Sequence, residues 1–180
     1  GDGVESSEQD FKAFRRVGMV GCGTGWDAAL GGKFMIARLA RINVEVDYGS
    51  EFRYRDPLVG PETLTIVISQ SGETADTRAA LHEAMRKRSK TLAICNVVGS
   101  MITREAAGTI ITHAGPEIGV ASTKAFTAQL TSLYLFSLFL AQQRGTMSAD
   151  QAKEALQELT RIPGQLAHML TLEEECEDLT

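Results

Sequence analysis

Short apolar segments alternate with longer amphipathic segments along most of this 180-residue chain. The short segments, which we expect to be strands, are residues 17–21, 43–47, 64–69, 91–95 and 109–112. The longer segments, which we expect to be helices, are residues 26–41, 73–87 and 122–143. Strands joined through helices pair in parallel, and nearly continuous apolar strands indicate a sheet covered on both faces. The pattern therefore predicts an α/β fold, a three-layer α-β-α sandwich around a five-stranded parallel sheet.

The chain is long enough for one domain with its own hydrophobic core. We expect residues 11–145 to form this domain, after a flexible segment over residues 1–10. Residues 146–180 should then add a helix and an acidic tail.

The last helix should begin at Ser148, because Ser148 and Gln151 have the spacing of a capping box. Pro163 and Gly164 should end it. The acidic stretch over residues 173–178 is typical of a solvated tail rather than a metal site.

Composition narrows the possible functions. A formal net charge of −5 argues against a nucleic-acid-binding protein, which usually carries a basic face. The most apolar stretch, Phe126 to Ala141, is too short and too rich in hydroxyl and amide groups for a membrane span, so we expect a buried helix. The polar start shows no signal peptide, and three cysteines without a CxxC pair indicate reduced thiols in a cytoplasmic protein. No motif requires a metal or a cofactor.

The stretch Ser69-Gln-Ser-Gly-Glu-Thr74 stands where the third strand should turn into a helix. Such a turn presents unpaired backbone N–H groups and the positive end of the helix dipole, which together bind anions such as phosphate. Ser71 could instead simply cap the helix, with Thr74 one turn later, and the residues alone leave both interpretations open. Glu73 and Asp76 suit the dipole but would repel a phosphate that they faced, so we expect both to point outward.

The loop from Gly21 to Gly25 follows the first strand and is similar to a glycine-rich nucleotide loop. Asp47 could supply the acidic residue that such a site needs after the second strand. The spacing lacks the full G-x-G-x-x-G pattern, however, because Ala28 occupies its last position. Close approach of the backbone to a ligand explains the glycines better.

A third loop, Gly115 to Lys124, follows the fifth strand and is shaped by two glycines and a proline. Ser122 can cap the helix that follows. Lys124 opposes the helix dipole, so it either serves a site or pairs with Glu117. Ligands in parallel sheets bind outside the carboxyl ends of the strands, so three shaped loops at this edge predict a binding site there.

These loops together resemble those of sugar isomerase (SIS) domains, and more narrowly the first SIS domain in the isomerase half of the glucosamine-6-phosphate synthase family. The residues that carry the resemblance are Cys22–Thr24, Ser50–Arg55, Ser69–Thr77, Ala93–Val97 and Glu117–Thr127, within residues 17–143. The Ser-Gln-Ser-Gly-Glu-Thr string is typical of many phosphosugar-binding SIS domains, whereas Glu-Ile-Gly-Val-Ala-Ser-Thr-Lys is narrower. The resemblance implies the flavodoxin- or Rossmann-like fold of that domain.

The resemblance also implies roles for particular residues. The sugar phosphate would be bound by Ser69, Gln70, Ser71, Thr74 and Gly25. The part of the site that holds the sugar would be lined by Cys22, Gly23, Thr24, Val120 and Ser122. The family usually has a phosphate-binding serine where this chain has Gly25, so we expect binding to be weaker by about 1 kcal/mol, with the Gly25 N–H still free to donate.

The family makes glucosamine 6-phosphate from fructose 6-phosphate and glutamine, so the resemblance implies either phosphosugar as the ligand. Its glutaminase domain and its second SIS domain have no counterpart in this sequence. Glu51 and Glu117 are possible acids or bases but belong to elements that look structural, so we assign no catalytic residue. We therefore expect a homodimeric fragment that binds the sugar phosphate and is inactive alone. The alternatives are a regulatory SIS domain that senses a phosphosugar, and a related fructosamine deglycase or sugar isomerase.

Overall fold

A computed structural model describes residues 8–118 and 122–170. The chain divides into two compact units, one ending at Thr146 and one beginning at Met147. Each unit is described by itself.

In the described part of the larger unit, all strands belong to one parallel sheet. They are β1 (Arg16–Gly21), β2 (Asn43–Tyr48), β3 (Thr63–Ser69), β4 (Lys90–Cys95) and β5 (Gly108–Ile111), in the spatial order β2-β1-β3-β4-β5. β3 is buried along its whole length, and β1 and β4 are buried after their first residue. Burial on both sides explains why these strands read as continuous apolar runs. The predicted five-stranded parallel sheet is confirmed.

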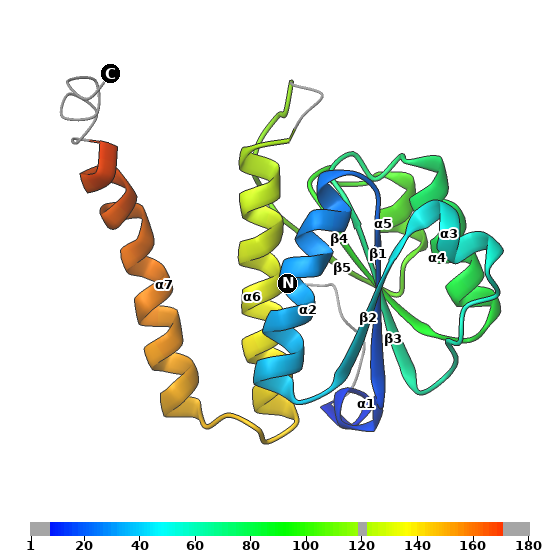
Figure 1. Ribbon diagram of the computed structural model, residues 1–180, viewed down its shortest axis with the longest axis horizontal. Helices are drawn as coiled ribbons and strands as arrows, with labels where there is room; N and C mark the ends of the chain where they lie inside the picture. The colour runs from blue at the N-terminus through cyan, green and yellow to red at the C-terminus, as the bar shows by residue number, and fades with distance from the viewer. Residues whose placement is uncertain (1–7, 119–121, 171–180) are drawn as a thin grey trace. The chain divides into compact units, whose positions relative to one another are not determined.

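Helices cover both faces of this sheet, as Figure 1 shows. On one face lie α2 (Thr24–Ala40) and α6 (Lys124–Gln143); on the other lie α3 (Gly49–Tyr54), α4 (Ala75–Arg86) and α5 (Met101–Glu105). The three-layer sandwich is therefore confirmed. A short helix, α1 (Glu8–Ala13), precedes β1, so the segment predicted to be flexible over residues 1–10 already enters a helix at Glu8.

Glycines allow α2 and α6 to pack closely. A Cβ on Gly31 would lie 2.8 Å from Leu130 Cδ2 of α6, and one on Gly32 would lie 3.0 Å from Leu133 Cδ1. α6 is the apolar helix expected in the core, because Leu133 and Leu140 are fully buried. None of the helices in the described residues is long and apolar enough to cross a membrane.

The smaller unit contains α7 (Ala149–Leu170). Its start is confirmed as a capping box, since the Ser148 N–H donates to Gln151 Oε1 at 2.9 Å and the Gln151 N–H donates to Ser148 Oγ at 3.2 Å. The prediction that Pro163 and Gly164 end the helix is wrong, because α7 continues through Pro163 to Leu170. A proline removes a single backbone donor, and the turns on either side keep theirs. The acidic stretch 173–178 lies outside the described residues.

Candidate functional site

The three predicted site loops leave the same edge of the sheet. Gly21 at the end of β1 pairs with Ile68 in β3, and Ser69 pairs with Cys95 at the end of β4. Cys95 in turn pairs with Ile111 at the end of β5. We name the segments that follow the β1 loop (Cys22–Gly25), the β3 loop (Ser69–Thr74) and the β5 loop (the described residues Thr112–Ile118 and Ser122–Thr123). The strand order changes direction between β1 and β3, and ligands of such sheets bind in the crevice at this switch point.

The hydroxyl groups of the β3 loop are held in place by the loop's own backbone. Ser69 Oγ accepts a hydrogen bond from the Gly72 N–H at 3.0 Å and lies 3.4 Å from Thr74 Oγ1. Ser71 Oγ accepts from the Glu73 N–H at 3.2 Å. A hydroxyl that accepts from the backbone keeps its own proton to donate. The loop therefore presents oriented donors beside the crevice.

The interpretation of Ser71 as the cap of the following helix is wrong. α4 begins at Ala75, and its N-cap residue is Thr74, which makes no side-chain cap bond. α2 likewise starts after Gly23 with no side-chain cap bond, two residues earlier than predicted. The first turn of α4 therefore keeps the positive end of its dipole open to a ligand, whereas in α2 the N–H groups of Gly25, Trp26 and Asp27 already bond the Cys22 and Gly23 carbonyls. This arrangement favours anion binding over simple capping.

The two carboxylates near the β3 loop have partners on other helices. Glu73 Oε1 accepts from the Met101 N–H at the start of α5, at 2.9 Å. Asp76 pairs with Arg53 of α3 at 3.8 Å. Both interactions agree with the expectation that these acids turn outward.

The β1 loop lies directly beside the start of α4. Thr77 Oγ1 of α4 lies 3.5 Å from Cys22 Sγ, and a Cβ added to Gly49 would lie 3.0 Å from the same sulfur. Cys22 and Thr24 are half-buried, and Gly23 is exposed with a left-handed φ of 54°. The fold thus brings the β1 loop beside the helix that follows the β3 loop, through a Thr77 contact that no expectation from the sequence included.

Gly25 lies in a different environment from the one expected for a residue that binds phosphate. Its N–H donates to the Cys22 carbonyl at 3.1 Å, so the expectation that this N–H is free is wrong. Gly25 is buried, and an added Cβ would lie 2.9 Å from the Ile68 carbonyl oxygen of β3. The glycine therefore closes the turn into α2 and lets that helix lie against the sheet.

The β5 loop is anchored to α6 by a carboxylate. Glu117 Oε2 accepts from the Ala125 N–H at 3.1 Å and lies 3.5 Å from Ser122 Oγ. Glu117 thus takes the capping role predicted for Ser122, and Thr123 is the N-cap residue by position. Glu117 is engaged with the backbone of α6 rather than with Lys124, which supports the structural role expected of it. Val120 lies outside the described residues.

α4 and α5, which flank the β3 loop, are joined by a charged cluster. Arg78 donates to both carboxylate oxygens of Glu105, with the shortest contact at 2.6 Å, and His82 Nε2 lies 2.8 Å from Glu105 Oε2. These hydrogen bonds, chiefly those from Arg78, lower the pKa of Glu105 to about 2. The pair therefore remains charged at neutral pH and ties the two helices together.

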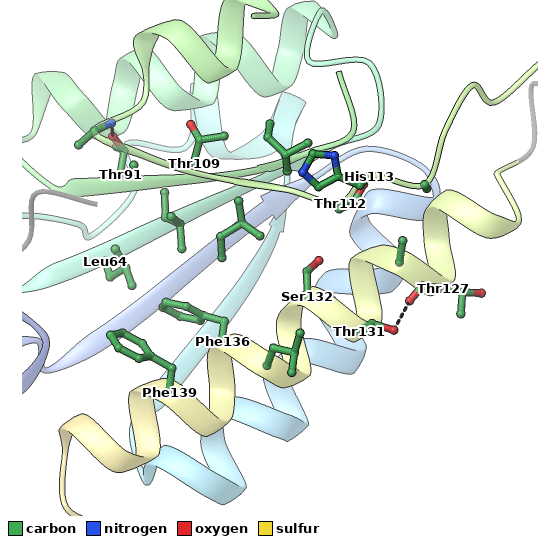
Figure 2. A pocket seen from close by; sticks show the side chains of 18 of the residues that line it. Leu64, Thr91, Thr109, Thr112, His113, Thr127, Thr131, Ser132, Phe136 and Phe139 are labelled. Atoms are coloured by element: carbon green, nitrogen blue, oxygen red, sulfur yellow. Dashed lines mark hydrogen bonds between the residues drawn. The ribbon is translucent and has the colours of Figure 1, made fainter. Parts of the chain in front are cut away.

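A large apolar groove lies on another part of the same unit, between α6 and the strands β4 and β5. Its cavity volume is about 1390 Å³. Figure 2 shows Phe136, Phe139 and Ser132 of α6 along it, with Leu64 on the sheet side and His113 at the far end. The lining offers mainly hydrocarbon and scattered hydroxyl groups, which suit an apolar surface better than a sugar phosphate.

Among residues 8–118 and 122–170, no three His, Cys, Asp or Glu side chains come close enough to hold a metal ion.

A family model described as "SIS domain" matches residues 11–138. The sequence is 51% identical over 169 residues to the glutamine–fructose-6-phosphate aminotransferase (isomerizing) of Caldanaerobacter subterraneus subsp. tengcongensis. It is 47% identical over 173 residues to the protein of that name from Clostridium tetani. These alignments cover 94% and 96% of this chain but 28% of each relative. The chain therefore spans little more than a quarter of the length of these relatives.

The structure is similar to the solved C-terminal domain of glucosamine-fructose-6-phosphate aminotransferase from Francisella tularensis. The TM-score is 0.89 at 36% sequence identity, over 96% of this chain and 48% of that one.

Proposed function

Because the chain belongs to the SIS domain family, we propose that it binds the phosphate of a phosphorylated sugar in the crevice between the β1 and β3 loops. The observation that carries this proposal is the β3 loop, where backbone N–H groups fix the hydroxyl oxygens of Ser69 and Ser71. These hydroxyls keep protons to donate, and α4 begins beside them without a side-chain cap.

The proposed phosphate ligands differ in exposure. Ser71, Thr74 and Gln70 are half-buried, so they can reach a ligand, and Ser69 is 5% exposed and orders the loop through Gly72. Gly25 is left out of the phosphate set because its N–H already bonds the Cys22 carbonyl.

The proposed sugar contacts come from the neighbouring loops. Cys22, Gly23 and Thr24 of the β1 loop lie beside α4, and Ser122 belongs to the β5 loop on the other side of β3 and β4. This order supports a ligand whose sugar end lies between these two loops and whose phosphate lies at the β3 loop.

The similarity to aminotransferases extends the proposal to a parent enzyme. We infer that the chain serves a cytoplasmic, homodimeric glutamine–fructose-6-phosphate aminotransferase (isomerizing) as its first SIS domain, with a glutaminase domain and a second SIS domain elsewhere. Its ligand is then fructose 6-phosphate or glucosamine 6-phosphate. The chain alone binds the phosphosugar without turnover, because the acid and base of the isomerisation come from other parts of the parent.

Thermal unfolding with and without ligand tests the proposal. Fructose 6-phosphate or glucosamine 6-phosphate should raise the Tm of this chain, because a ligand at 100 times its Kd stabilises the folded state by about 2.7 kcal/mol. Fructose and glucosamine at the same concentration should leave the Tm unchanged. Equal shifts with and without the phosphate, or no shift with any of the four sugars, would remove the proposal.

A further inference from the structure

We propose that Asn96 is a positioning residue that holds the β5 loop in place and thereby sets the affinity for the sugar end of the ligand, not for its phosphate. This inference rests on the phosphosugar binding proposed above. Asn96 is the first residue after β4, between the β3 and β5 loops, and it is half-buried.

Asn96 is bonded to both loops. Its backbone N–H donates to the Gln70 carbonyl of the β3 loop at 3.1 Å. Its side chain makes three bonds to the β5 loop. Oδ1 accepts from the Ala114 N–H at 2.8 Å and from Thr112 Oγ1 at 3.0 Å, and Nδ2 donates to the Gly115 carbonyl at 2.7 Å. Three hydrogen bonds from one side chain therefore hold residues 112–115, the first turn of the β5 loop.

That first turn is strained and needs such support. His113 has a left-handed φ of 52°, a backbone conformation that is strained for a residue with a side chain. The bonds from Thr112 and Ala114 to Asn96 lie on either side of His113 and offset this strain. Without the amide, the turn can relax to a conformation with negative φ.

The direction of the β5 loop depends on this turn. From Gly115 the loop leads to Glu117, whose carboxylate bonds the Ala125 N–H at the start of α6 and lies near Ser122. The loop is thus fixed at its start by Asn96 and at its end by Glu117. Loss of the hydrogen bonds from Asn96 therefore shifts the position of Ser122, the proposed sugar contact on this loop.

The β3 loop has supports that do not use the Asn96 side chain. The Gln70 carbonyl accepts a backbone N–H, which any substitution of Asn96 except proline retains. The Gly72 carbonyl accepts from the Ile102 N–H at 3.2 Å, and Glu73 bonds Met101. The phosphate end of the site therefore remains formed when the Asn96 side chain is removed.

The required chemistry is specific to asparagine. The position needs one oxygen that accepts two donors and one nitrogen that donates, on the same planar group. Aspartate offers only acceptors, so its second oxygen would meet the Gly115 carbonyl where Nδ2 now lies 2.7 Å away.

The test measures the affinities of two ligands, fructose 6-phosphate and inorganic phosphate, by isothermal titration calorimetry on the 180-residue chain. Asn96→Ala should weaken fructose 6-phosphate about tenfold and leave inorganic phosphate within about twofold. Thr112→Val removes one of the three bonds and should weaken fructose 6-phosphate about threefold with no change for inorganic phosphate. Asn43→Ala, at an exposed asparagine at the other end of the sheet, is the control and should change neither affinity.

Each outcome decides one question. A loss of affinity for fructose 6-phosphate alone supports the positioning role, because general damage would weaken both ligands together. An equal loss for both ligands, or no loss for either, overturns it. If Asn96→Ala does not fold, as circular dichroism would show, the conservative Thr112→Val variant decides by the same two affinities. Failure of the unsubstituted chain to bind either ligand overturns the proposed function itself and is distinguishable from these results.

Discussion

Two hollows of the larger unit differ in chemistry. The crevice beside the β3 loop is built from hydroxyls and backbone N–H groups, and hydrogen bonds fix their orientation. The groove beside α6 has a volume of about 1390 Å³ and is lined by strand side chains and by phenylalanines such as Phe136. Oriented donors, not volume, are the reason that we propose the crevice as the phosphosugar site.

The comparison predicts a separation of effects. Removal of hydroxyls in the crevice should change ligand affinity and leave the free energy of unfolding nearly unchanged, whereas removal of the phenylalanine rings that α6 contributes to the groove should do the reverse. Five variants test this separation, and they are given in decreasing order of expected effect.

Gly72→Ala should have the largest effect and should change both quantities. Gly72 has a left-handed φ of 69°, and an added Cβ would lie 2.0 Å from Ser100 Oγ and 2.8 Å from Cys95 Sγ. Strain and overpacking together should lower the free energy of unfolding by about 3 kcal/mol and distort the β3 loop. Urea denaturation and fructose 6-phosphate titration measure the two losses.

The matched control is Gly164→Ala in α7, where an added Cβ meets no atom of the described residues within 4 Å. It should stabilise the chain by about 0.5–1 kcal/mol, because alanine favours a helix more than glycine does. Unchanged stability and affinity in Gly72→Ala would show that the β3 loop is not held as the structure describes.

Phe136→Ala should lower stability without changing affinity. Phe136 is 6% exposed and packs against Phe11 and Phe139 at ring-centroid distances of 6.4 Å and 6.3 Å. Because one side of the ring borders the open groove, we expect a loss of about 2 kcal/mol, below the usual range for a fully enclosed phenylalanine. Phe34→Ala, at a ring that is 73% exposed, should cost little by comparison. Weaker phosphosugar binding in Phe136→Ala would break the separation between the two hollows.

Ser71→Ala and Thr74→Val should weaken affinity without lowering stability. Each removes a hydroxyl that we propose as a phosphate donor, so fructose 6-phosphate should bind about tenfold more weakly, a loss of about 1.4 kcal/mol. The free energy of unfolding should change by no more than about 0.5 kcal/mol. Thr160→Val, a similar change on α7 in the smaller unit, is the control. Full affinity in both crevice variants would indicate that these hydroxyls serve the loop alone.

Glu105→Gln should lower stability in a pH-dependent way. The pKa of Glu105 is lowered from 4.5 to about 2 in the folded chain, mainly by Arg78. The ionised carboxylate therefore stabilises the fold fully above a pH of about 4.5, and this contribution is lost as the pH falls toward 2. We expect a loss of about 1 kcal/mol at pH 7, since solvent partly screens the pair.

Urea denaturation at pH 7, 4 and 3 measures this loss. The difference in the free energy of unfolding between Glu105→Gln and the unsubstituted chain should shrink at the lowest pH. Glu83→Gln is the matched control, because Glu83 bonds Arg86 within α4 and joins no second element. Its cost should be about 0.3–0.5 kcal/mol. A pH-independent loss in Glu105→Gln would contradict the charged state of the pair.

The strands, and the sheet edge at which the site lies, could be predicted from residues close together in the sequence. β1, β3 and β4 begin within one residue of their predicted starts, because burial on both faces demands continuous apolar residues. The β3 loop was recognised from its hydroxyls and glycine at a strand-to-helix turn. Parallel pairing then placed the three loops at one edge, since all strands end there.

The misassigned features depend on hydrogen-bond partners that the apolar pattern does not reveal. The outward direction expected for Glu73 likewise depends on its bond to Met101, 28 positions away. Glu117 displaces Ser122 as the cap of α6 by reaching Ala125, eight positions on. The Gly25 N–H is taken by the Cys22 carbonyl because α2 starts earlier than the apolar pattern suggested.

The α/β sandwich, the parallel sheet and the loop that we propose to bind phosphate follow from the order of apolar and polar residues along the chain, so they could be predicted before the fold was known. Which groups remain free to bind depends on contacts that form only in the folded chain. The tertiary structure assigned the Gly25 N–H to a turn, turned Glu73 away from the crevice and joined Asn96 to two loops. The physical reason is that a hydrogen-bonding group binds a ligand only if no neighbour in the fold already satisfies it, and those neighbours come together only when the chain folds.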